Sequence, residues 1–408
     1  MSEFFITVII MLVAARVFGE IAQRLRQPAL VGELLAGVII GPSLLGFVHI
    51  DVSLKVITDL GVFFLMFLTG LEMHPDEIKK AGKRAVVLSI AAFLVPFVAG
   101  AGVASLLGLD MIVSLFIGLV LAITAVPVAA VVLMEFNLLR SKLGTTVLTA
   151  GVINDILSLV VLAIILQMAS NPDQQVDLGN IGFSVIKIGA FVGGIFLLDF
   201  ILGKTKHFLP KAFAPWFEKL KTREAAFGIL LMTAIGLSLI AEQVGLHFII
   251  GTFFAGLIIY RDLIGKENFE RVNGIFSAIT FGFLAPIFFA FIGVELNVFS
   301  IADHLPLFAL LLAVAIGGKI GGGYIGAKLV GFSKSESKTI GYLMNNRGMV
   351  ELVIAAIGLE AGLIDVGMFS VLVAIGFITT IMSPIMARHS LRRSQQPADS
   401  ESTNMRHD

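Results

Sequence analysis

Residues 21–41 have the sequence IAQRLRQPALVGELLAGVIIG, and residues 240–260 repeat it in altered form as IAEQVGLHFIIGTFFAGLIIY, without a gap. The alignment places Gly32 on Gly251 and Ala36-Gly37 on Ala255-Gly256. Further along each copy, FLTGLE at 67–72 resembles AFIGVE at 290–295. Either match alone can arise by chance, but two matches in the same order indicate an internal repeat.

The composition places this repeat in a membrane protein. Of the 408 residues, 57% are hydrophobic and 14% are charged, whereas soluble domains carry about 25% charged residues. A soluble fold of this length cannot bury so much apolar surface. A membrane-spanning helix needs about 20 mostly apolar residues, which predicts thirteen spans at about 4–22, 28–47, 54–73, 85–107, 111–135, 143–168, 180–202, 224–242, 246–261, 273–295, 305–331, 336–360 and 365–387. We therefore expect an all-α polytopic membrane protein with about 13 transmembrane helices.

The positions of the two copies predict their relative orientation. The first copy begins at span 1 and the second at span 8, so an odd number of spans separates them and they are inverted in the bilayer. Inverted repeats are typical of secondary transporters, whose ion sites lie near the bilayer midplane where broken helices meet. We expect a transmembrane domain over 1–388, with inverted six-helix repeats at about 4–168 and 224–387, a linker helix at 180–202 and a short polar cytoplasmic tail at 389–408.

Basic residues predict the orientation of the whole chain. With the N-terminus outside, the predicted outer loops hold Lys55 alone, whereas every predicted inner loop carries Lys or Arg. This bias predicts an outer N-terminus and a cytoplasmic C-terminus, and we expect a bacterial inner membrane. Glu33 and Arg16 lie deeper and either pair with each other or line a dimer contact. Four acidic residues are expected near the outer ends of their spans: Glu72, Glu242, Glu295 and Glu360.

One acidic residue lies near the middle of a span. Asp155 falls within GVINDILSLVVLAIILQ at 151–167, and its nearest charged neighbours in sequence are Lys142 and Asp173. An ionisable group at this depth is costly and is a candidate for function. A carboxylate there accepts a proton or coordinates a bare Na+ or K+, but not easily both, and this competition is sufficient for exchange. The alternative is a structural Asp satisfied by hydroxyl or amide groups.

Two polar residues are predicted to share this site. Asn154 can coordinate a cation through its amide oxygen but carries no proton, so a single exchanging carboxylate predicts electroneutral exchange; otherwise Asn154 only hydrogen-bonds a helix crossing. In LAITAVPVAA at 121–130, Pro127 removes a backbone donor and Thr124 adds a hydroxyl. This pair predicts an unwound helix whose free carbonyls and hydroxyl form an oxygen-rich cation site.

The second half of the chain carries a further group of charges. NNRGMVELV at 345–353 contains Arg347 and Glu351, which are four residues apart and can pair on one helix face. Pairing makes their burial tolerable, and the pair is as compatible with a structural role as with a transporting one. Lys319 lies among glycines in AIGGKIGGGYIG, and its possible partners are Asp155, Glu351 or the C-terminal dipoles of broken helices. We expect Lys319 to stabilise or gate rather than to carry the ion.

Other functional classes have little support in the sequence. The absence of cysteine excludes disulfides, thiolate metal sites and Cys nucleophiles, and without HExxH or GxSxG an intramembrane enzyme is not indicated. A net charge of +0 implies no attraction to nucleic acid. A channel filter motif such as TVGYG is also missing. No cofactor is expected.

Together, the motifs resemble the monovalent cation:proton antiporter-2 superfamily, and most closely its plant cation/H+ exchangers and cyanobacterial Na+/H+ antiporters. The resemblance covers about residues 5–388. The motifs that carry it are QPALVGELLAGVIIGPSLLG (27–46), GLEMHPDEIKKAGKRA (70–85), TAVPVAAVVL (124–133), VIND (152–155), HFIIGTFFAGLII (247–259), GGKIGGG (317–323) and MNNRGMVELVIAAIG (344–358). The family fold implies a homodimer in which each chain has a scaffold domain and a mobile core domain.

The resemblance also implies roles for individual residues. Asp155 is the carrier of the proton and of Na+, K+ or Li+, and Thr124 lies in the first of two unwound helices that cross beside it. Arg347 and Glu351 belong to the second half of the crossing, and Lys319 matches the lysine beside the site. Electrogenic relatives have two adjacent acids here, and the lysine pairs with the first. Asn154 replaces that acid, which supports electroneutral exchange and leaves the partner of the lysine open.

The resemblance predicts a secondary active monovalent cation/proton antiporter whose partners are these ions and the membrane lipids. Three alternatives remain: a Kef-like potassium efflux system, a gated cation channel and an inverted-repeat symporter of organic anions. The preference between Na+ and K+ depends on cavity size and field strength, which the sequence does not specify.

Overall fold

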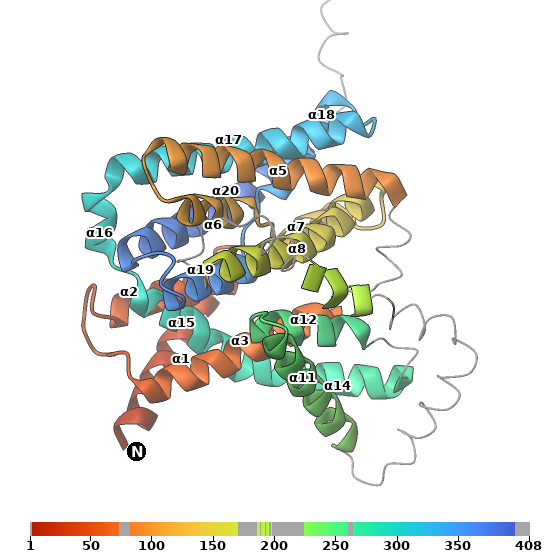
Figure 1. Ribbon diagram of the computed structural model, residues 1–408. Coiled ribbons are helices and arrows are strands. Elements are labelled where there is room, and N and C mark those ends of the chain that lie inside the picture. Colours follow the sequence, from red (N-terminus) through yellow and green to blue (C-terminus); the bar gives the residue numbers. More distant parts are fainter. Residues whose placement is uncertain are drawn as a thin grey trace, which may run out of the picture.

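The computed structural model describes residues 2–72, 82–169, 224–259 and 264–395, together with scattered residues between 186 and 197. Every regular element in these ranges is a helix (Figure 1), which confirms the predicted all-α class. Nine helical stretches among them are long and apolar enough to span a membrane, and two shorter apolar helices cover Ala29–Ile40 and Phe248–Ile258. The predicted linker helix lies largely outside the described residues, so the count of thirteen stays a prediction.

The described helices form two groups. The scaffold group contains α1 (Ser2–Arg24), α2 (Ala29–Ile40), α3 (Val52–Glu72), α11 (Ala225–Gln243), α12 (Phe248–Ile258), α14 (Lys266–Ile279), the π-helical turn η1 (Thr280–Leu284) and α15 (Ala285–Glu295). The site group contains α5 (Gly82–Leu106), α6 (Met111–Ala122), α7 (Val126–Glu135), α8 (Lys142–Ala169), α17 (Leu305–Leu329), α18 (Lys334–Met344), α19 (Met349–Glu360) and α20 (Val366–Gln395). The short helix α16 (Val298–Asp303) connects α15 to α17.

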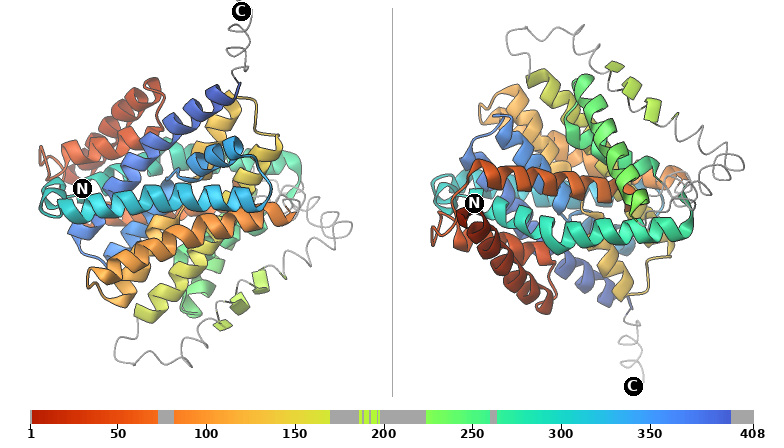
Figure 2. Two further views of the ribbon diagram at one scale, coloured as in Figure 1. Left: turned by 90° about the horizontal axis from the view of Figure 1, so that it is seen from above. Right: turned by 90° about the horizontal axis from the view of Figure 1, so that it is seen from below.

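Helices pack mainly within their own group. In the site group, for example, α5 lies beside α17, as Figure 1 and the left view of Figure 2 show. The main contacts between the groups are made by α3 with α19 and by α2 with α20. Helix α20 also continues through residues 389–395, which the sequence had assigned to the polar tail, and residues 396–408 lie outside the described ranges.

Two helices of the site group are interrupted. The first break separates α6 from α7 at residues 123–125, where Ile123 and Ala125 have extended backbone. Pro127 is the second residue of α7, a position at which its missing N–H costs no helical hydrogen bond. The second break, at residues 345–348, separates α18 from α19. The unwound segment expected from Thr124 and Pro127 is therefore confirmed, and the second half of the chain contains a matching one.

Glycines at two helix crossings follow the alignment of the internal repeat. A Cβ on Gly37 or on Gly293 would overlap a carbonyl oxygen of the facing helix, at the crossing of α2 with α15. The same holds for Gly256 and Gly70 at the crossing of α12 with α3. The repeat alignment pairs Gly37 with Gly256 and Gly293 with Gly70. Each glycine of the α2–α15 crossing therefore has its counterpart in the α12–α3 crossing. The two crossings are thus compatible with the internal repeat, which stays a prediction.

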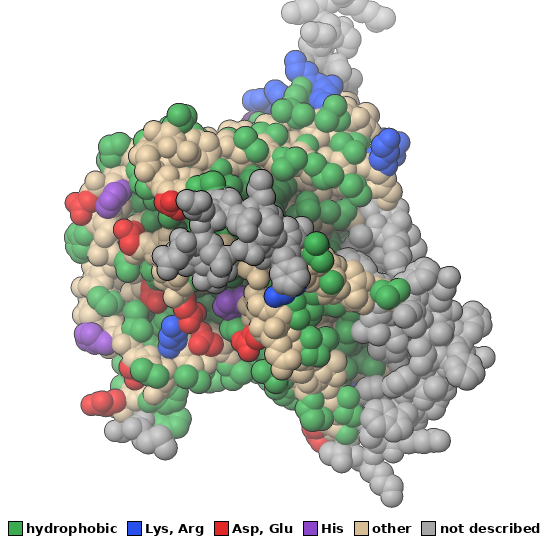
Figure 3. Space-filling view, viewed as in Figure 1, with side chains coloured by type: hydrophobic (Ala, Val, Ile, Leu, Met, Phe, Trp, Pro, Cys, Tyr) green, Lys and Arg blue, Asp and Glu red, His purple; other side chains and the backbone are tan. Residues whose placement is uncertain are grey.

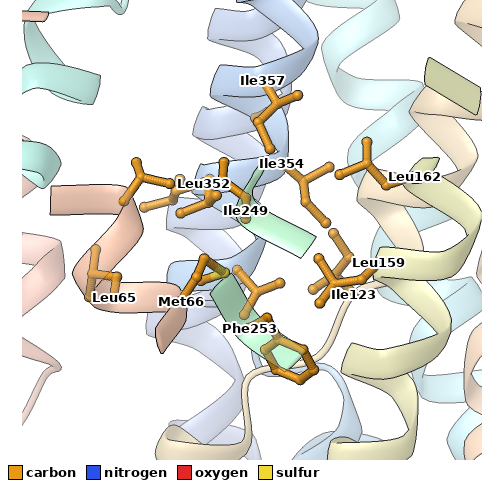
Figure 4. Packing of buried hydrophobic residues seen from close by; sticks show 14 of the residues in the cluster. Leu65, Met66, Ile123, Leu159, Leu162, Ile249, Phe253, Leu352, Ile354 and Ile357 are labelled. Atoms are coloured by element: carbon orange, nitrogen blue, oxygen red, sulfur yellow. The ribbon is translucent and has the colours of Figure 1, made fainter. Parts of the chain in front are cut away.

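Apolar side chains fill much of the boundary between the two groups. Figure 4 shows this packing with side chains from both sides: Leu65, Met66, Ile249 and Phe253 from the scaffold group, and Ile123, Leu159, Leu162, Leu352, Ile354 and Ile357 from the site group. All of them are less than 4% exposed. The polar residues of the candidate site must therefore lie where this apolar packing between the two groups is interrupted.

Candidate functional site

Asp155 lies in α8 beside the first helix break, at the boundary between the two groups. It is 3% exposed and lines a cavity of about 30 Å³. Residues 123–127, from the first break and the start of α7, form most of the wall together with residues 348–350, from the second break and the start of α19. Thr69 and Glu72 of α3 complete it from the scaffold group. A cavity of at least roughly 10–15 Å³ can hold a water-sized species. The space beside Asp155 is therefore large enough for one small ion.

Several polar atoms around this cavity have no hydrogen-bond partner among the described residues. They include Oδ1 of Asp155, Oγ1 of Thr124 and both polar side-chain atoms of Asn154. Buried polar groups are nearly always satisfied, so unpartnered oxygens gathered in one place indicate a ligand. Thr124 and Asp155 line the cavity, whereas Asn154 is fully buried and is not among the lining residues. A role of Asn154 as a ligand of the ion stays a prediction.

Lys319, on α17, is fully buried and points its ammonium group at backbone carbonyls. It donates to the carbonyl oxygen of Ala92, 3.1 Å away, and to that of Ala122. Pro96, four residues after Ala92 in α5, has no N–H to occupy the first carbonyl, and Ala122 is the last residue of α6. The C-terminal end of a broken helix is therefore a partner of Lys319, one of the three alternatives that the sequence left open.

Arg347 and Glu351 form the ion pair that their spacing predicts. Nη1 of Arg347 lies 2.7 Å from Oε1 of Glu351, and the two side chains are 0% and 2% exposed. The guanidinium also donates to the carbonyl oxygens of Val120 at 2.8 Å and Leu121 at 2.9 Å. Because cations are stabilised at helix C-termini, Arg347 and Lys319 both stabilise the end of α6 at the break.

Backbone and side-chain contacts also fix the crossing of the two breaks. The backbone N–H of Ala125 in the first break donates to the carbonyl oxygen of Asn346 in the second, at 2.8 Å. The hydroxyl of Thr380 on α20 donates to the carbonyl oxygen of Arg347 at 2.9 Å. These bonds hold the two unwound segments against each other. The residues of the first segment that are near Asp155 line the cavity.

A second, much larger cavity of about 700 Å³ leads toward the small one. Glu72, Pro127 and Met349 line both cavities. The large cavity is also lined by Glu135 and Arg388, which form a two-pronged ion pair with distances of 2.8 and 2.9 Å. We call this side of the protein the Arg388 face. Asp155 is therefore approached from the Arg388 face.

The sequence prediction for Glu72 is wrong. Glu72 was expected near the outer end of its span, as Glu360 was, but it lies at the opposite end of α3 from Lys55, which contacts Glu360. The error arose from assigning Glu72 to the wrong end of its span. Placing α3 between Lys55 and the basic loop that follows Glu72 would have put this acid on the Arg388 side of the ion cavity.

Arg16 and Glu33, which the sequence left undecided, both line the large cavity. Nη2 of Arg16 donates to the carbonyl oxygens of Phe281 at 2.5 Å and Gly282 at 2.6 Å, which lie in η1. Glu33 is 6% exposed. The two residues therefore add charge of both signs to the wall of the approach from the Arg388 face.

Comparisons with known proteins agree with this arrangement. The family model for the sodium/hydrogen exchanger, transmembrane, matches residues 8–392. A probable Na(+)/H(+) antiporter 3 of Methanocaldococcus jannaschii is 30% identical over 95% of this chain and 97% of its own length. The Na(+)/H(+)-K(+) antiporter GerN of Bacillus cereus is 28% identical over 95% of this chain and 96% of its own length.

A solved structure shows the same fold. The sodium proton antiporter MjNhaP1 from Methanocaldococcus jannaschii at pH 8 superposes with a TM-score of 0.74, covering 97% of this chain and 100% of that chain, at 18% sequence identity. At this identity the likeness concerns the fold alone. The match of the family model over nearly the whole chain identifies the protein as a multi-pass membrane transporter that belongs to the sodium/hydrogen exchanger family.

Proposed function

We propose that the protein exchanges a monovalent cation, Na+ or K+, for a proton by alternating access to Asp155. The observation that carries this proposal is the ion-sized cavity at the crossing of two helix breaks. The carboxylate of Asp155 and the hydroxyl of Thr124 line it, each with an oxygen that has no hydrogen-bond partner among the described residues, and Glu72 lines it from α3. In the part of the chain that the structure describes, it is approached from the Arg388 face only. An open channel would need an approach from both faces at once.

The chemistry of the cavity supports competition between the two ions. A cation bound there would be coordinated by the carboxylate of Asp155, the hydroxyl of Thr124 and carbonyl oxygens of the break, which are ligands typical of hard cations. A proton on Asp155 removes the negative charge that makes this coordination favourable. One carboxylate therefore binds either ion, and a change of access between the two binding events moves them in opposite directions.

The surroundings of Asp155 support one-for-one exchange. Asn154 carries no proton, Lys319 is held by two carbonyl oxygens, and Glu351 is held by Arg347. Each of these buried groups has a structural reason to keep its charge state through the cycle. Asp155 then carries one charge in each direction, which makes transport electroneutral.

The location follows from the basic residues and the apolar surface. We assign the Arg388 face to the cytoplasm, because the predicted inner loops carry Lys or Arg and the predicted outer loops hold Lys55 alone. The exposed apolar residues of α1, among them Val13, Val17 and Ile21, support contact with lipid or with a second copy in a homodimer. A bacterial inner membrane is the setting in which we expect this exchange.

Everted membrane vesicles provide the test. After a pH gradient is imposed, Na+, K+ and Li+ are added separately, and at least one of them should dissipate the gradient. Asp155→Asn should abolish the response, whereas Asp303→Asn, the same chemical change at an exposed position of α16, should keep it. A pH gradient that none of the three ions dissipates would refute the proposal.

The stoichiometry is tested in liposomes. Exchange by the purified protein should proceed at the same rate with and without an imposed membrane potential, since no net charge moves. A clear acceleration by the potential would contradict one-for-one exchange while leaving the role of Asp155 intact.

A further inference from the structure

The end of the protein opposite the Arg388 face, which we call the Lys55 face, carries an ion pair that joins the two helix groups. Nζ of Lys55, near the start of α3, lies 2.9 Å from Oε1 of Glu360, the last residue of α19. Helix α3 belongs to the scaffold group and α19 to the site group. The pair stands at one of the two main contacts between the groups. We call it the Lys55 latch.

Lys55 and Glu360 also line a small pocket at this end of the protein. This pocket has a volume of about 80 Å³, against about 700 Å³ for the cavity on the Arg388 face. Val353 and Ile357 of α19 form part of its wall, and Val353 is completely buried. Ile249 and Ile357 of this pocket belong to the same buried apolar packing as Ile123, which lines the cavity beside Asp155 (Figure 4). The approach to Asp155 is thus closed on the Lys55 side.

The charges around Lys55 are arranged so that the latch can open. Asp59, one turn further along α3, and Glu295, at the end of α15, line the same pocket. Both belong to the scaffold group, as Lys55 does, so they stay near the ammonium group if α19 moves away. In the view of Figure 3, acidic side chains gather on the left, whereas most Lys and Arg side chains lie at the top and right.

We propose that the Lys55–Glu360 ion pair between α3 and α19 is a latch that closes the approach to Asp155 from the Lys55 face. The pair breaks when that approach opens. This inference rests on the alternating access proposed above. Lys55 exchanges Glu360 for Asp59 and Glu295 as α19 withdraws, so its charge keeps a partner throughout. Glu360, released at the same time, adds a carboxylate to a pocket that then attracts cations from that side.

The size of the effect follows from the exposure of the pair. The side chains of Lys55 and Glu360 are 46% and 47% exposed, and such partly exposed pairs stabilise a conformation by an amount equivalent to up to about a fivefold change in an equilibrium constant. Removing the latch should therefore raise the population of the state that is open on the Lys55 face by up to about fivefold. Exchange continues without the latch, but the resting equilibrium is shifted toward the state that is open on the Lys55 face.

The test uses the absence of native cysteine, because a single introduced thiol then reports without background. Val353→Cys places a thiol on the wall of the closed pocket, and its labelling by a membrane-impermeant thiol reagent measures how often that face opens. Adding Lys55→Met or Glu360→Gln should increase the labelling rate by up to about fivefold. Glu242→Gln, a matched change at an exposed position of α11, should leave the rate unchanged. Equal rates in all four proteins would overturn the latch.

A second measurement guards against variants that fold poorly. Lys55→Cys combined with Glu360→Cys, bridged by a short bifunctional thiol reagent, should stop exchange, and reductive cleavage of the bridge should restore it. Undiminished exchange in the bridged protein would also refute the latch. The labelling assay needs no transported ion, so a failure of the proposed exchange leaves its result interpretable.

Discussion

The buried ion pair between Arg347 and Glu351 gives a prediction whose size can be worked out. Glu351→Leu leaves the guanidinium of Arg347 inside the site group without its carboxylate, at a position where both side chains are at most 2% exposed. Removing one partner of a buried pair costs about 3–5 kcal/mol, because an uncompensated charge remains. The two bonds from Arg347 to the carbonyl oxygens of Val120 and Leu121 persist and place the loss toward the lower end of that range.

Thermal unfolding in detergent is the assay. With the unfolding entropy per residue of globular proteins, a loss of about 3–5 kcal/mol in a chain of this length lowers Tm by about 4–6 °C. The double variant Arg347→Met with Glu351→Leu removes the unpaired charge and should recover part of this loss. Recovery stays incomplete, since the two carbonyl oxygens at the end of α6 lose their donor. A single variant as stable as the unchanged protein, or a double variant less stable than the single one, would refute this reasoning.

Three further outcomes are expected. Lys319→Met should lower Tm, because two buried carbonyl oxygens lose a donor at a cost of about 1–3 kcal/mol each. Cation-dependent exchange should persist in this variant. Complete loss of exchange with unchanged Tm would make Lys319 part of the ion pathway instead. Thr124→Val, which keeps the volume and removes the hydroxyl, should raise the KM for the cation by roughly tenfold or more, whereas Thr124→Ser should not; equal KM values would remove this hydroxyl from the site. Gly256→Ala should reduce the yield of folded protein because its Cβ meets the carbonyl oxygen of Phe67, and Gly317→Ala, with nothing within 4 Å, is the control that should not.

Much of the candidate site could be predicted from the chain alone. Asp155 is distinctive because a carboxylate in the middle of a long apolar run is costly at that depth, and the structure places it beside a cavity. Thr124 and Pro127 identified the first helix break through the chemistry of proline and hydroxyl groups. The spacing of Arg347 and Glu351 predicted their pairing, because helix periodicity brings residues four apart together.

Other features depend on elements that are remote in sequence. The partners of Lys319 are carbonyl oxygens of α5 and α6, and a carbonyl freed by a remote proline or helix end leaves no signal near the lysine. Glu72 reaches the wall of both cavities only because α3 packs against the site group. Asn154 is next to Asp155 in sequence, but successive residues of a helix are rotated by about 100° from each other, and Asn154 is not among the residues that line the cavity.

The sequence by itself determined the membrane environment and the helical class, and it predicted the internal repeat and the buried acid at position 155. Each of these follows from local properties: hydrophobicity over a span, the spacing of residues along a helix, and the cost of a charge in lipid. Only the tertiary structure decided which face is open, which carbonyl oxygens hold Lys319, and that Lys55 contacts Glu360 across the boundary of the two groups. These depend on how helices from remote parts of the chain pack together, and many packings are compatible with the same apolar pattern.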